Sequence, residues 1–416
     1  MNILLSAFAC APNFGSELAA GWNFAEQLAL QGHRVVVLTH DESKSYIERY
    51  SGKIPENLSF IYYRLPLWFK KIVYRGVGPL AHIYYFFWQI GSFVYLKRYL
   101  KHEEIDLIHL VTIGVFRTPV FLGLFSPPFV LGPVGGGEYS TSELAQALPM
   151  KYRMKEVARH FANMSVRLNP LMYLTYSTAD LILLRTSDNL RYIPKRYHAK
   201  CKVSLEVGAP NKAVVCTVQP MEENEDFKIL FAGRLEYWKG IHLAVRAFAE
   251  ILRYEPLAVF TIVGSGSDEH WIHNIAKETG VYDKIEWITR IPQEELFKMY
   301  QNYDIFLFPS LHDSGGYVVT EALSFGLPVM CLDLGGPKER ITNQCGIIIK
   351  TENKTQDQII QNIGEELIKL IENTSRLSDL KDGALQTAIA NTWEKVVRRI
   401  YSLIKENIES KEPQRL

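Results

Sequence analysis

The feature that most constrains the fold of this chain is the order of strand, glycine loop and helix in residues 304–329. Bulky apolar residues at 305–308 predict a buried strand, which a proline and a serine end. Gly315 and Gly316 follow, and we expect a helix to begin just after them and to carry Glu321. Parallel α/β sheets form anion sites in this way, because glycine lets the backbone approach a ligand and the helix N-terminus offers free N–H groups and positive potential.

Two carboxylates flank this glycine loop and suggest what it binds. Asp313 and Glu321 stand eight positions apart, so a ligand with a phosphate and several hydroxyl groups would use the glycines and the acids together. A nucleotide sugar has that chemistry. Strand–turn–helix units occur throughout α/β proteins, however, and an acid beside a glycine is often only a helix cap. On this stretch alone, a binding site is only slightly favoured.

Length and element order predict the domains. A chain of 416 residues exceeds one ordinary core, so two domains are expected. Strands alternate with helices in both halves, which predicts two Rossmann-like, doubly wound parallel sheets. We expect an N-terminal domain at residues 1–208, completed by a C-terminal helix at about 391–416, and a C-terminal domain at 209–390. A polar, proline-broken linker is expected at 208–225.

Charge is distributed unevenly along the chain. Residues 1–208 hold 23 Lys and Arg against 15 Asp and Glu, whereas the remainder holds 23 against 30. Residues 60–100 interleave aromatic and basic side chains, and residues 151–202 are also basic. This pattern predicts an anionic partner, most simply a membrane leaflet or a phosphorylated acceptor. The alternative is that the aromatic residues pack in the core and the charges form ordinary solvated faces.

Cysteine usage and the terminal sequence predict the compartment. The five cysteines are odd in number and form no close pair, so neither a disulfide framework nor a zinc knuckle is indicated and a reducing cytoplasm is expected. No apolar run reaches the length of a membrane span, and the N-terminus lacks the basic start of a signal peptide. We therefore expect a cytoplasmic protein, attached at most peripherally to the inner face of the plasma membrane.

The first loop of the N-terminal half carries three candidate residues. A strand at residues 2–9 is followed by Gly15, Ser16 and Glu17 and then by a helix. This unit opens a Rossmann-like half but lacks the Gly-x-Gly-x-x-Gly fingerprint of dinucleotide binding. Gly15 and Ser16 are placed to contact a phosphate or an acceptor. Glu17 is equally consistent with a helix cap and with a hydroxyl contact.

Two later strands of this half end in further candidates. His109 lies near the end of a buried strand, at the edge where parallel sheets collect ligands, so it is either an acceptor contact or a structural histidine. Another strand runs into three consecutive glycines at 135–137, which are costly unless the backbone approaches something closely. We expect Gly136 to line the acceptor site and Glu138 to contact the sugar or the acceptor.

A second motif opens the C-terminal half. A strand at 227–232 precedes Gly233-Arg234-Leu-Glu-Tyr-Trp-Lys239-Gly240, which places two cations on one loop. A guanidinium fork and an ammonium charge together suit a diphosphate, and fixed cations stabilise the negative charge that grows on a departing nucleoside diphosphate without a metal. For this motif alone, a surface loop with two ordinary charges is an equal alternative.

Together the two motifs resemble the glycosyltransferase family 4 group (glycosyl transferases group 1), and the resemblance extends over essentially the whole chain. It implies the α/β GT-B fold, with two Rossmann-like doubly wound parallel-sheet domains facing across a cleft. It also implies retention of anomeric configuration, no metal and no cofactor. It assigns Arg234 and Lys239 to the donor diphosphate, Glu321 to the ribose and Asp313 to the donor sugar. The expected donor contacts are Gly15, Gly233, Gly264, Gly266, Arg290, Ile291, Ser314, Gly315 and Gly316.

The sequence departs from the family pattern in two places. Asp313 stands where the family usually has glutamate and Gly315 where it usually has phenylalanine, which leaves the donor sugar open. Many members have a catalytic histidine after the strand that here ends in residues 132–137, and no histidine is present there. The glycine-rich loop at this position, with the run from Gly15 to Asn23, resembles a recognisable branch of the family.

The expected function is transfer of a sugar from a nucleoside-diphosphate sugar to an acceptor hydroxyl, in cell-surface polysaccharide or glycolipid biosynthesis. One alternative is a sugar-nucleotide epimerase on the same fold, whose product would stay on the nucleotide. Another is a non-catalytic sugar-nucleotide-binding partner in an envelope assembly complex, against which the intact Arg234, Lys239 and Glu321 argue. The expected partners are the nucleotide sugar, a sugar or lipid-linked acceptor and an anionic membrane, with no nucleic acid.

Overall fold

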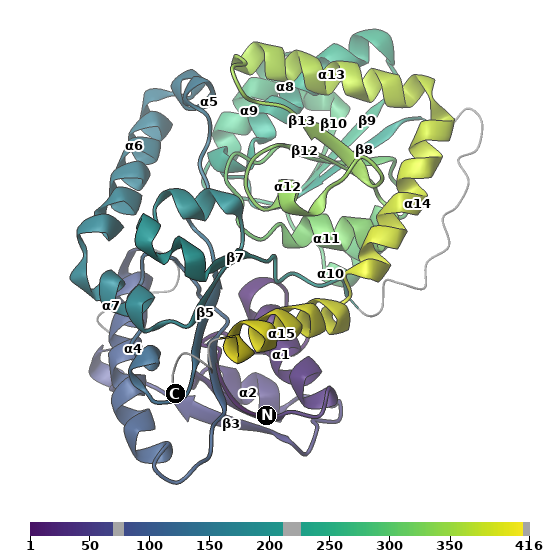
Figure 1. Cartoon of the computed structure of the whole chain (residues 1–416). Coiled ribbons are helices and arrows are strands. Elements are labelled where there is room, and N and C mark those ends of the chain that lie inside the picture. The colour runs from purple at the N-terminus through teal and green to yellow at the C-terminus, as the bar shows by residue number, and fades with distance from the viewer. Residues whose placement is uncertain (70–78, 211–225, 411–416) are drawn as a thin grey trace. The chain divides into compact units, whose positions relative to one another are not determined.

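The computed structural model describes residues 1–69, 79–210 and 226–410 (Figure 1). The chain divides into two compact units. Unit 1 comprises Met1–Gly137, His160–Glu206 and Trp393–Leu416, and unit 2 comprises Glu138–Arg159 and Val207–Thr392. Some expected features lie outside the described residues. These are most of the linker, part of the aromatic and basic segment at 60–100, Cys216 and the end of the C-terminal helix.

This division differs from the expected one in residues 138–159, which the sequence assigned to the N-terminal domain. Leu148 and Tyr152 are buried in the apolar core of unit 2. The Tyr152 ring stacks on Tyr237 with 4.6 Å between ring centroids, and its hydroxyl donates to Asp268 Oδ1 over 2.8 Å. The segment therefore belongs to unit 2. The core against which its apolar side chains pack determines its unit, whereas its position in the sequence does not.

Unit 1 is built on a seven-stranded parallel sheet with the order β3-β2-β1-β4-β5-β6-β7. In the register, Ile3 of β1 pairs with Val35 of β2 on one side and with Leu107 of β4 on the other. Most of the strands are short apolar runs, as expected of a parallel sheet that is covered on both faces. The strands are β1 (Asn2–Ser6), β2 (Arg34–His40), β3 (Leu58–Tyr63), β4 (Leu107–Leu110), β5 (Phe129–Val134), β6 (Leu181–Leu184) and β7 (Cys201–Val203).

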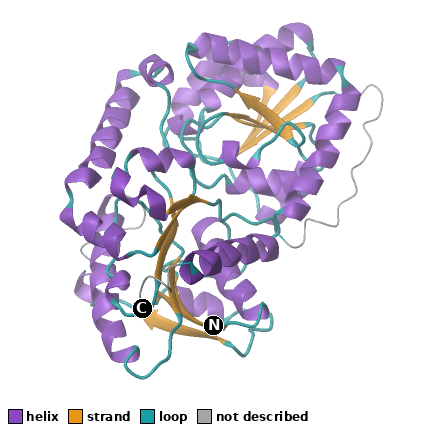
Figure 2. Cartoon of the chain, viewed as in Figure 1, coloured by secondary structure: helices purple, strands orange, loops and turns teal. Residues whose placement is uncertain are grey.

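Helices pack around this sheet (Figure 2). The C-terminal helix returns to unit 1, where the rings of Phe24 and Trp393 lie 6.2 Å apart and Gln31 Nε2 donates to the Glu394 carbonyl over 3.3 Å. Its apolar face is buried. The helices of unit 1 are α1 (Ser16–Leu30), α2 (Ser43–Glu48), α4 (Pro79–Tyr99), α7 (Pro170–Thr178) and α15 (Trp393–Glu409).

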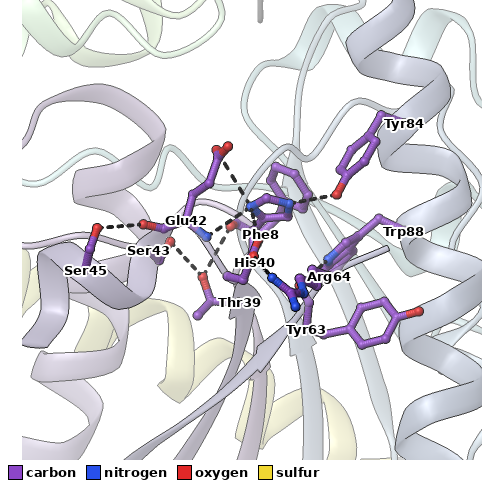
Figure 3. A network of polar contacts seen from close by, with 11 residues as sticks. Phe8, Thr39, His40, Glu42, Ser43, Ser45, Tyr63, Arg64, Tyr84 and Trp88 are labelled. Carbon is purple, nitrogen blue, oxygen red and sulfur yellow. Dashed lines mark hydrogen bonds and ion pairs between the residues drawn. The ribbon is translucent and has the colours of Figure 1, made fainter. Parts of the chain in front are cut away.

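The aromatic residues of segment 60–100 divide between core and surface. Tyr84 and Trp88 of α4 are fully buried. Figure 3 shows how they are held: Tyr84 Oη lies 2.9 Å from His40 Nε2, and Trp88 Nε1 donates to the Tyr63 carbonyl over 3.1 Å. The packing interpretation is therefore correct for these two residues. Exposed aromatic residues of the same segment are Trp68, Phe87 and Tyr95.

Unit 2 is built on a six-stranded parallel sheet with the order β10-β9-β8-β11-β12-β13. The predicted strand at 305–308 is β11, and its neighbours in the sheet are β8 and β12. Its four residues are all buried, because the sheet is covered on both faces. The strands are β8 (Lys228–Ala232), β9 (Val259–Val263), β10 (Ile285–Ile288), β11 (Ile305–Phe308), β12 (Val329–Leu332) and β13 (Gly346–Ile349).

The helices of unit 2 connect these strands and cover the sheet. Helix α6 begins in unit 2 and its last turn belongs to unit 1. Within the described residues, no helix is long and apolar enough to cross a bilayer. The helices are α5 (Ser142–Ala147), α6 (Met150–Met164), α8 (Ile241–Tyr254), α9 (Glu269–Glu278), α10 (Gln293–Tyr300), α11 (Tyr317–Ser324), α12 (Pro337–Arg340), α13 (Gln356–Glu372) and α14 (Thr374–Ala390).

Candidate functional site

The donor loops predicted from the sequence meet at the carboxyl edge of the unit 2 sheet. Chain order reverses between the neighbouring strands β8 and β11, since β9 and β10 continue beyond β8 while β12 and β13 continue beyond β11. In open parallel sheets, ligands bind outside the carboxyl ends of the strands at such a switch point. The loop after β8 carries Arg234 and Lys239, and the loop after β11 carries Asp313. The structure therefore brings the two predicted motifs together.

Lys239 and Asp313 form an ion pair across this switch point. Lys239 Nζ donates to Asp313 Oδ2, and the two side chains are only 11% and 14% exposed. Asp313 Oδ1 accepts the N–H of Gly315 over 3.1 Å and of Gly316 over 2.8 Å. Burial opposes ionisation of Asp313, but Lys239 and these N–H groups outweigh burial and lower its pKa. The two glycine N–H groups, expected to bind a ligand phosphate, are thus used by the Asp313 carboxylate.

Close backbone contacts account for several glycines at this edge. Gly240 has a φ of 71°, and a Cβ there would collide with the Pro309 carbonyl oxygen. A Cβ on Gly264, an expected donor position, would likewise collide with the Gly233 carbonyl oxygen, so this glycine is required for packing of the two loops on each other. The same holds for Gly266, whose Cβ would meet the Leu235 carbonyl. Gly335 and Gly336, which the sequence analysis missed, pack in this way on the backbone of Asp313 and Ser314.

A second buried network lies next to the ion pair in sequence and in space. His312 Nε2 donates to Glu156 Oε1 over 2.9 Å, and Tyr237 Oη donates to the same oxygen over 2.7 Å. Burial opposes ionisation of Glu156, but these hydrogen bonds and the charge of Arg159 hold its pKa at about 2. Burial lowers the pKa of His312, so a neutral imidazole donates to a carboxylate at neutral pH. The ring of His312 stacks on Trp238 at 5.4 Å, which fixes the loops after β8 and β11 together.

Sequence reasoning missed this network because its partners are far apart in the chain. Glu156 and His312 are separated by 156 positions, and Glu156 lies in the segment assigned to the other domain. The available signal was the strongly amphipathic pattern of residues 150–164, which shows that one face of this helix must pack on a core.

Glu321 lies on the second turn of α11, where the sequence placed it. Gln293 Nε2 donates to Glu321 Oε1 over 3.1 Å. Burial nevertheless raises the pKa of Glu321 to about 7. A carboxylate with few protein donors around it keeps the capacity to accept hydrogen bonds from the hydroxyl groups of a ligand, and such perturbed acids are typical of functional sites.

The other expected residues of unit 2 are held in different ways. The exposed guanidinium of Arg234 lies 5.4 Å from the Trp238 ring centroid, and no carboxylate pairs with it in the part of the chain that the structure describes. Ser314 Oγ donates to Glu138 Oε2 over 2.6 Å, and Glu138 is fully buried. Glu138, expected to contact sugar or acceptor, therefore packs against the donor loop within unit 2. Two further expected contacts follow β10, the exposed Arg290 and the half-buried Ile291.

Unit 1 has its own switch point, between β1 and β4. Glu17 bridges it, because Oε2 accepts the N–H of Ile113 over 2.8 Å and Oε1 accepts from Arg185 Nη2 over 2.7 Å. Arg185 Nε also lies 2.7 Å from Glu206 Oε1, and both of these side chains are buried. The N-cap of α1 is Gly15, without a side-chain cap. Glu17 is therefore an anchor between two loops, a role that differs from both sequence interpretations.

The backbone of unit 1 is strained at this edge. Three non-glycine residues there adopt positive φ, which is uncommon for any residue with a side chain and an outlier for the β-branched Ile113. They are Asn13, Ser16 and Ile113, with φ of 61°, 57° and 53°. Gly15 and Ser16 are exposed and stay predicted ligand contacts. Gly136 is half-buried at a φ of 96°, and its carbonyl accepts from Asn163 Nδ2 over 3.3 Å.

The contacts of His109 favour the structural one of its two sequence interpretations over an acceptor contact. It is fully buried, and both ring nitrogens are bonded. Nε2 lies 2.7 Å from the Gly132 carbonyl oxygen, which only accepts, so Nδ1 accepts from Tyr401 Oη at 3.0 Å. Burial lowers the pKa of His109 to about 4. The neutral ring therefore ties the end of β4 to β5 and to α15.

The described part of the chain shows no three His, Cys, Asp or Glu side chains grouped to hold a metal ion. Arg234 and Lys239 carry positive charge on the loop after β8, and the exposed Arg290 follows β10 at the same sheet edge. Four cysteines are described, and all are free thiols: Cys10, Cys201, Cys331 and Cys345.

Comparisons with known proteins agree with this geometry. Residues 218–387 match the family model for glycosyl transferases group 1. A D-inositol 3-phosphate glycosyltransferase of Corynebacterium aurimucosum is 26% identical over 233 residues, which cover 52% of this chain and 54% of that protein. The chain thus spans about half the length of this curated relative.

Solved structures resemble the chain over nearly its full length. Sucrose-phosphate synthase from Thermosynechococcus elongatus has a TM-score of 0.67 at 16% identity, covering 98% of this chain and 99% of the other. HepE of Anabaena, solved in complex with UDP, has a TM-score of 0.60 at 15% identity, covering 98% of this chain and 100% of the other.

These likenesses show the fold. The two parallel-sheet, Rossmann-like units have the GT-B α/β fold, as predicted. The family match at 218–387 contains Arg234, Lys239, Asp313 and Glu321, so the predicted donor residues of unit 2 lie within the matched region.

Proposed function

We propose that the protein is a glycosyltransferase that moves a sugar from a nucleoside diphosphate to an acceptor hydroxyl, with retention of the anomeric configuration and without a metal. The observation that carries this proposal is the Lys239–Asp313 ion pair at the switch point of unit 2, with the exposed Arg234 on the same loop as the lysine. Two cations and a fixed carboxylate at the edge where ligands collect suit a charged diphosphate joined to a polyhydroxylated sugar. The match to glycosyl transferases group 1 supports it.

The cations of this edge retain capacity for a ligand. Lys239 Nζ gives one N–H to Asp313, and the ammonium has two more donors. Arg234 offers a planar fork that can bind two phosphate oxygens at once, and its guanidinium is positioned over the Trp238 ring. Glu321, whose pKa is raised although Gln293 and Tyr300 donate to it, is suited to accept from ribose hydroxyls.

In the proposed reaction, the bond between the anomeric carbon and the diphosphate oxygen breaks. A bond from the anomeric carbon to the acceptor oxygen forms, and the acceptor proton passes to the departing diphosphate. Negative charge grows on the diphosphate, where Lys239 and Arg234 stabilise it. Removing one preorganised donor of this kind typically costs about 10²–10³-fold in rate. Asp313 holds the ammonium in place and faces the donor sugar.

We place the acceptor at the carboxyl edge of the unit 1 sheet. The exposed Gly15 and Ser16 lie there, and Glu17 is already used by Arg185 and by the N–H of Ile113. Acceptor recognition would therefore depend on backbone and hydroxyl groups more than on a free charge. A sugar or lipid-linked acceptor of cell-surface polysaccharide or glycolipid synthesis, met in the cytoplasm at the inner membrane face, fits this proposal.

A transfer assay tests the proposal. The protein is incubated in EDTA with UDP-, GDP- and ADP-hexoses and with sugar or lipid-linked acceptors, and nucleotide release and product are measured for the wild type and for Lys239→Met. Lys298→Met, at an exposed lysine of α10, is the matched control. We expect EDTA-resistant transfer that only Lys239→Met lowers, with the anomeric configuration retained by NMR. A changed sugar that stays on the nucleotide would identify an epimerase, and nucleotide binding without any turnover would identify a binding partner; either result contradicts the proposal.

A further inference from the structure

Helix α6, which is labelled in Figure 1, carries a stripe of exposed apolar side chains. Met150, Met154 and Val157 in unit 2 are 67%, 66% and 55% exposed, and the same spacing continues in this helix at Phe161, which is 67% exposed. A helix turns by about 100° per residue, so spacings of four, three and four place the four side chains within roughly 60° of one face. Exposed apolar residues are ordinary when they are scattered, but a continuous stripe indicates an interaction surface.

The opposite face of α6 packs on unit 2. The stripe is therefore not the face by which this helix joins the core of its own unit. Tyr152 is buried against Tyr237 and donates to Asp268. Glu156 accepts from His312 and Tyr237 and is nearly buried. The stripe therefore points away from the surface that fixes the helix to unit 2.

Basic side chains border the stripe on both sides. Lys151 and Lys155 follow it on one side, and the exposed Arg153 and His160 lie on the other. The ammonium groups of Lys151 and Lys155 lie 5.1 and 5.5 Å from the Tyr152 ring centroid, so their positions are constrained. Residues 150–164 contain four Lys or Arg and one acid, and that acid, Glu156, faces inward.

We propose that α6 lies in the headgroup region of an anionic lipid bilayer, with the stripe of Met150, Met154, Val157 and Phe161 inserted and the flanking cations at the phosphates. A helix with an apolar face of this kind, basic flanks and low mean hydropathy binds at the interface and does not span the membrane. The long stems of lysine and arginine let their charges reach the headgroups while the apolar side chains are immersed. Lys151 Nζ lies 3.7 Å from Asp268 Oδ1, but its side chain is 66% exposed, so an anionic surface can attract it as well.

This surface follows from α6 alone, whereas its use to reach a lipid-linked acceptor rests on the proposed function. It also assigns the membrane contact to a different segment from α4, where Tyr84 and Trp88 are buried and Phe87 and Tyr95 are exposed. The stripe and the donor edge occupy separate residues, so the two proposals can fail independently.

Vesicle binding tests the inference with the full-length protein. Sedimentation is compared between phosphatidylcholine vesicles with and without phosphatidylglycerol, at low and high salt, for the wild type and for Met154→Gln/Phe161→Gln. Each removed apolar side chain should lower the partition constant roughly tenfold, so about a hundredfold for the pair. Leu30→Gln/Leu257→Gln is the matched control, since these leucines are 65% and 66% exposed elsewhere, and it should bind as the wild type does.

The flanking charges are tested in the same assay. Lys151→Gln/Lys155→Gln should lower binding to anionic vesicles about 25-fold at low salt and little at high salt, because each lysine near an anionic surface contributes about 1 kcal/mol, or fivefold. Lys298→Gln/Lys350→Gln, at exposed lysines away from α6, is the control. Equal vesicle binding by the wild type and the stripe variant overturns the inference. A wild-type dimer that becomes a monomer in the stripe variant also overturns it, because a second copy of the chain would then cover the stripe.

Nucleotide binding separates the two proposals. If the stripe variant loses vesicle binding and is still stabilised by a nucleoside diphosphate, α6 is the membrane element of an intact protein. If no nucleotide stabilises the wild type but the vesicle results stand, the proposed function fails and the inference about α6 holds.

Discussion

The carboxyl edges of the two sheets are built alike but use their charged residues differently. At the unit 2 switch point, Arg234 is exposed and Lys239 has donors beyond its bond to Asp313. At the unit 1 switch point, Arg185 is buried and is paired with both Glu17 and Glu206. The first edge keeps charge available for a ligand, whereas the second uses its charges to join loops of its own unit.

This difference shows that a charged residue in a ligand-collecting loop need not be a ligand contact. Both edges carry the glycines, acids and cations that suggest a site in a sequence. The exposure and the partners of the charged groups decide which edge can bind an anion. We therefore expect substitutions at the unit 2 edge to change binding and rate, and those at the unit 1 edge to change stability.

The largest expected effect is at Lys239. Lys239→Met should lower transfer by about 10²–10³-fold, because it removes a fixed cation from the diphosphate. It should also cost about 3–5 kcal/mol of stability, because Asp313 is left as an unpaired, nearly buried charge. Unfolding in urea and product formation at saturating donor measure the two effects. The pair Lys239→Met/Asp313→Asn separates them, since it should regain stability without regaining rate; recovery of rate would refute a role for the cation in the reaction.

Arg185 should show the reverse pattern. Arg185→Met leaves the buried Glu206 without its cation, and removal of one partner of a buried pair typically costs about 3–5 kcal/mol. Nucleotide affinity, measured by calorimetry at a temperature where the variant is folded, should stay within twofold of the wild type. A variant that kept its stability but lost nucleotide affinity would remove the distinction between the two edges.

Glu321 should make stability depend on pH. Its pKa is raised to about 7 in the folded protein from an ordinary 4.5, so the folded state binds this proton more tightly. That contribution is fully present below about pH 4.5 and is lost as pH rises through 7, by up to about 3 kcal/mol. Glu321→Gln cannot ionise. The free energy of unfolding of Glu321→Gln relative to that of the wild type should therefore rise between pH 4 and pH 8. Urea unfolding across this range measures this difference in stability. A difference that does not change with pH would contradict the raised pKa.

The smallest expected effect on rate is at His109. His109→Leu leaves the Gly132 carbonyl and the Tyr401 hydroxyl without their buried partner, which should cost about 1–3 kcal/mol of stability. The transfer rate of the folded variant should not change. The pH profile of the rate should be the same in both proteins between pH 5 and 8, because the pKa of His109 is only about 4. A lost inflection in that profile would restore His109 as a functional residue.

The fold and the donor edge could be predicted from the sequence because their signals are local. The apolar run at 305–308, the glycines after it and Glu321 all lie within one strand–loop–helix unit, and β11 and α11 formed as predicted. The same is true of the Arg234 and Lys239 loop after β8.

The remainder depends on contacts between distant segments. Nothing near Glu156 in the sequence indicates His312 as its partner, and nothing near Glu17 indicates Arg185. The spacing of Gly315 and Gly316 suggested free N–H groups, but it could not show that Asp313 would accept from both. Burial of a polar residue, and therefore its availability to a ligand, is a property of the packed units.

The most direct test of the donor site is thermal unfolding of the wild type and Lys239→Met with UDP, GDP and ADP, with and without EDTA. We expect one nucleotide to stabilise the wild type by roughly 2.7 kcal/mol at a concentration a hundredfold above its Kd. EDTA should leave this stabilisation unchanged, and Lys239→Met should abolish it. Stabilisation by none of the nucleotides, or equal stabilisation of both proteins, would contradict a nucleoside-diphosphate site at the switch point of unit 2.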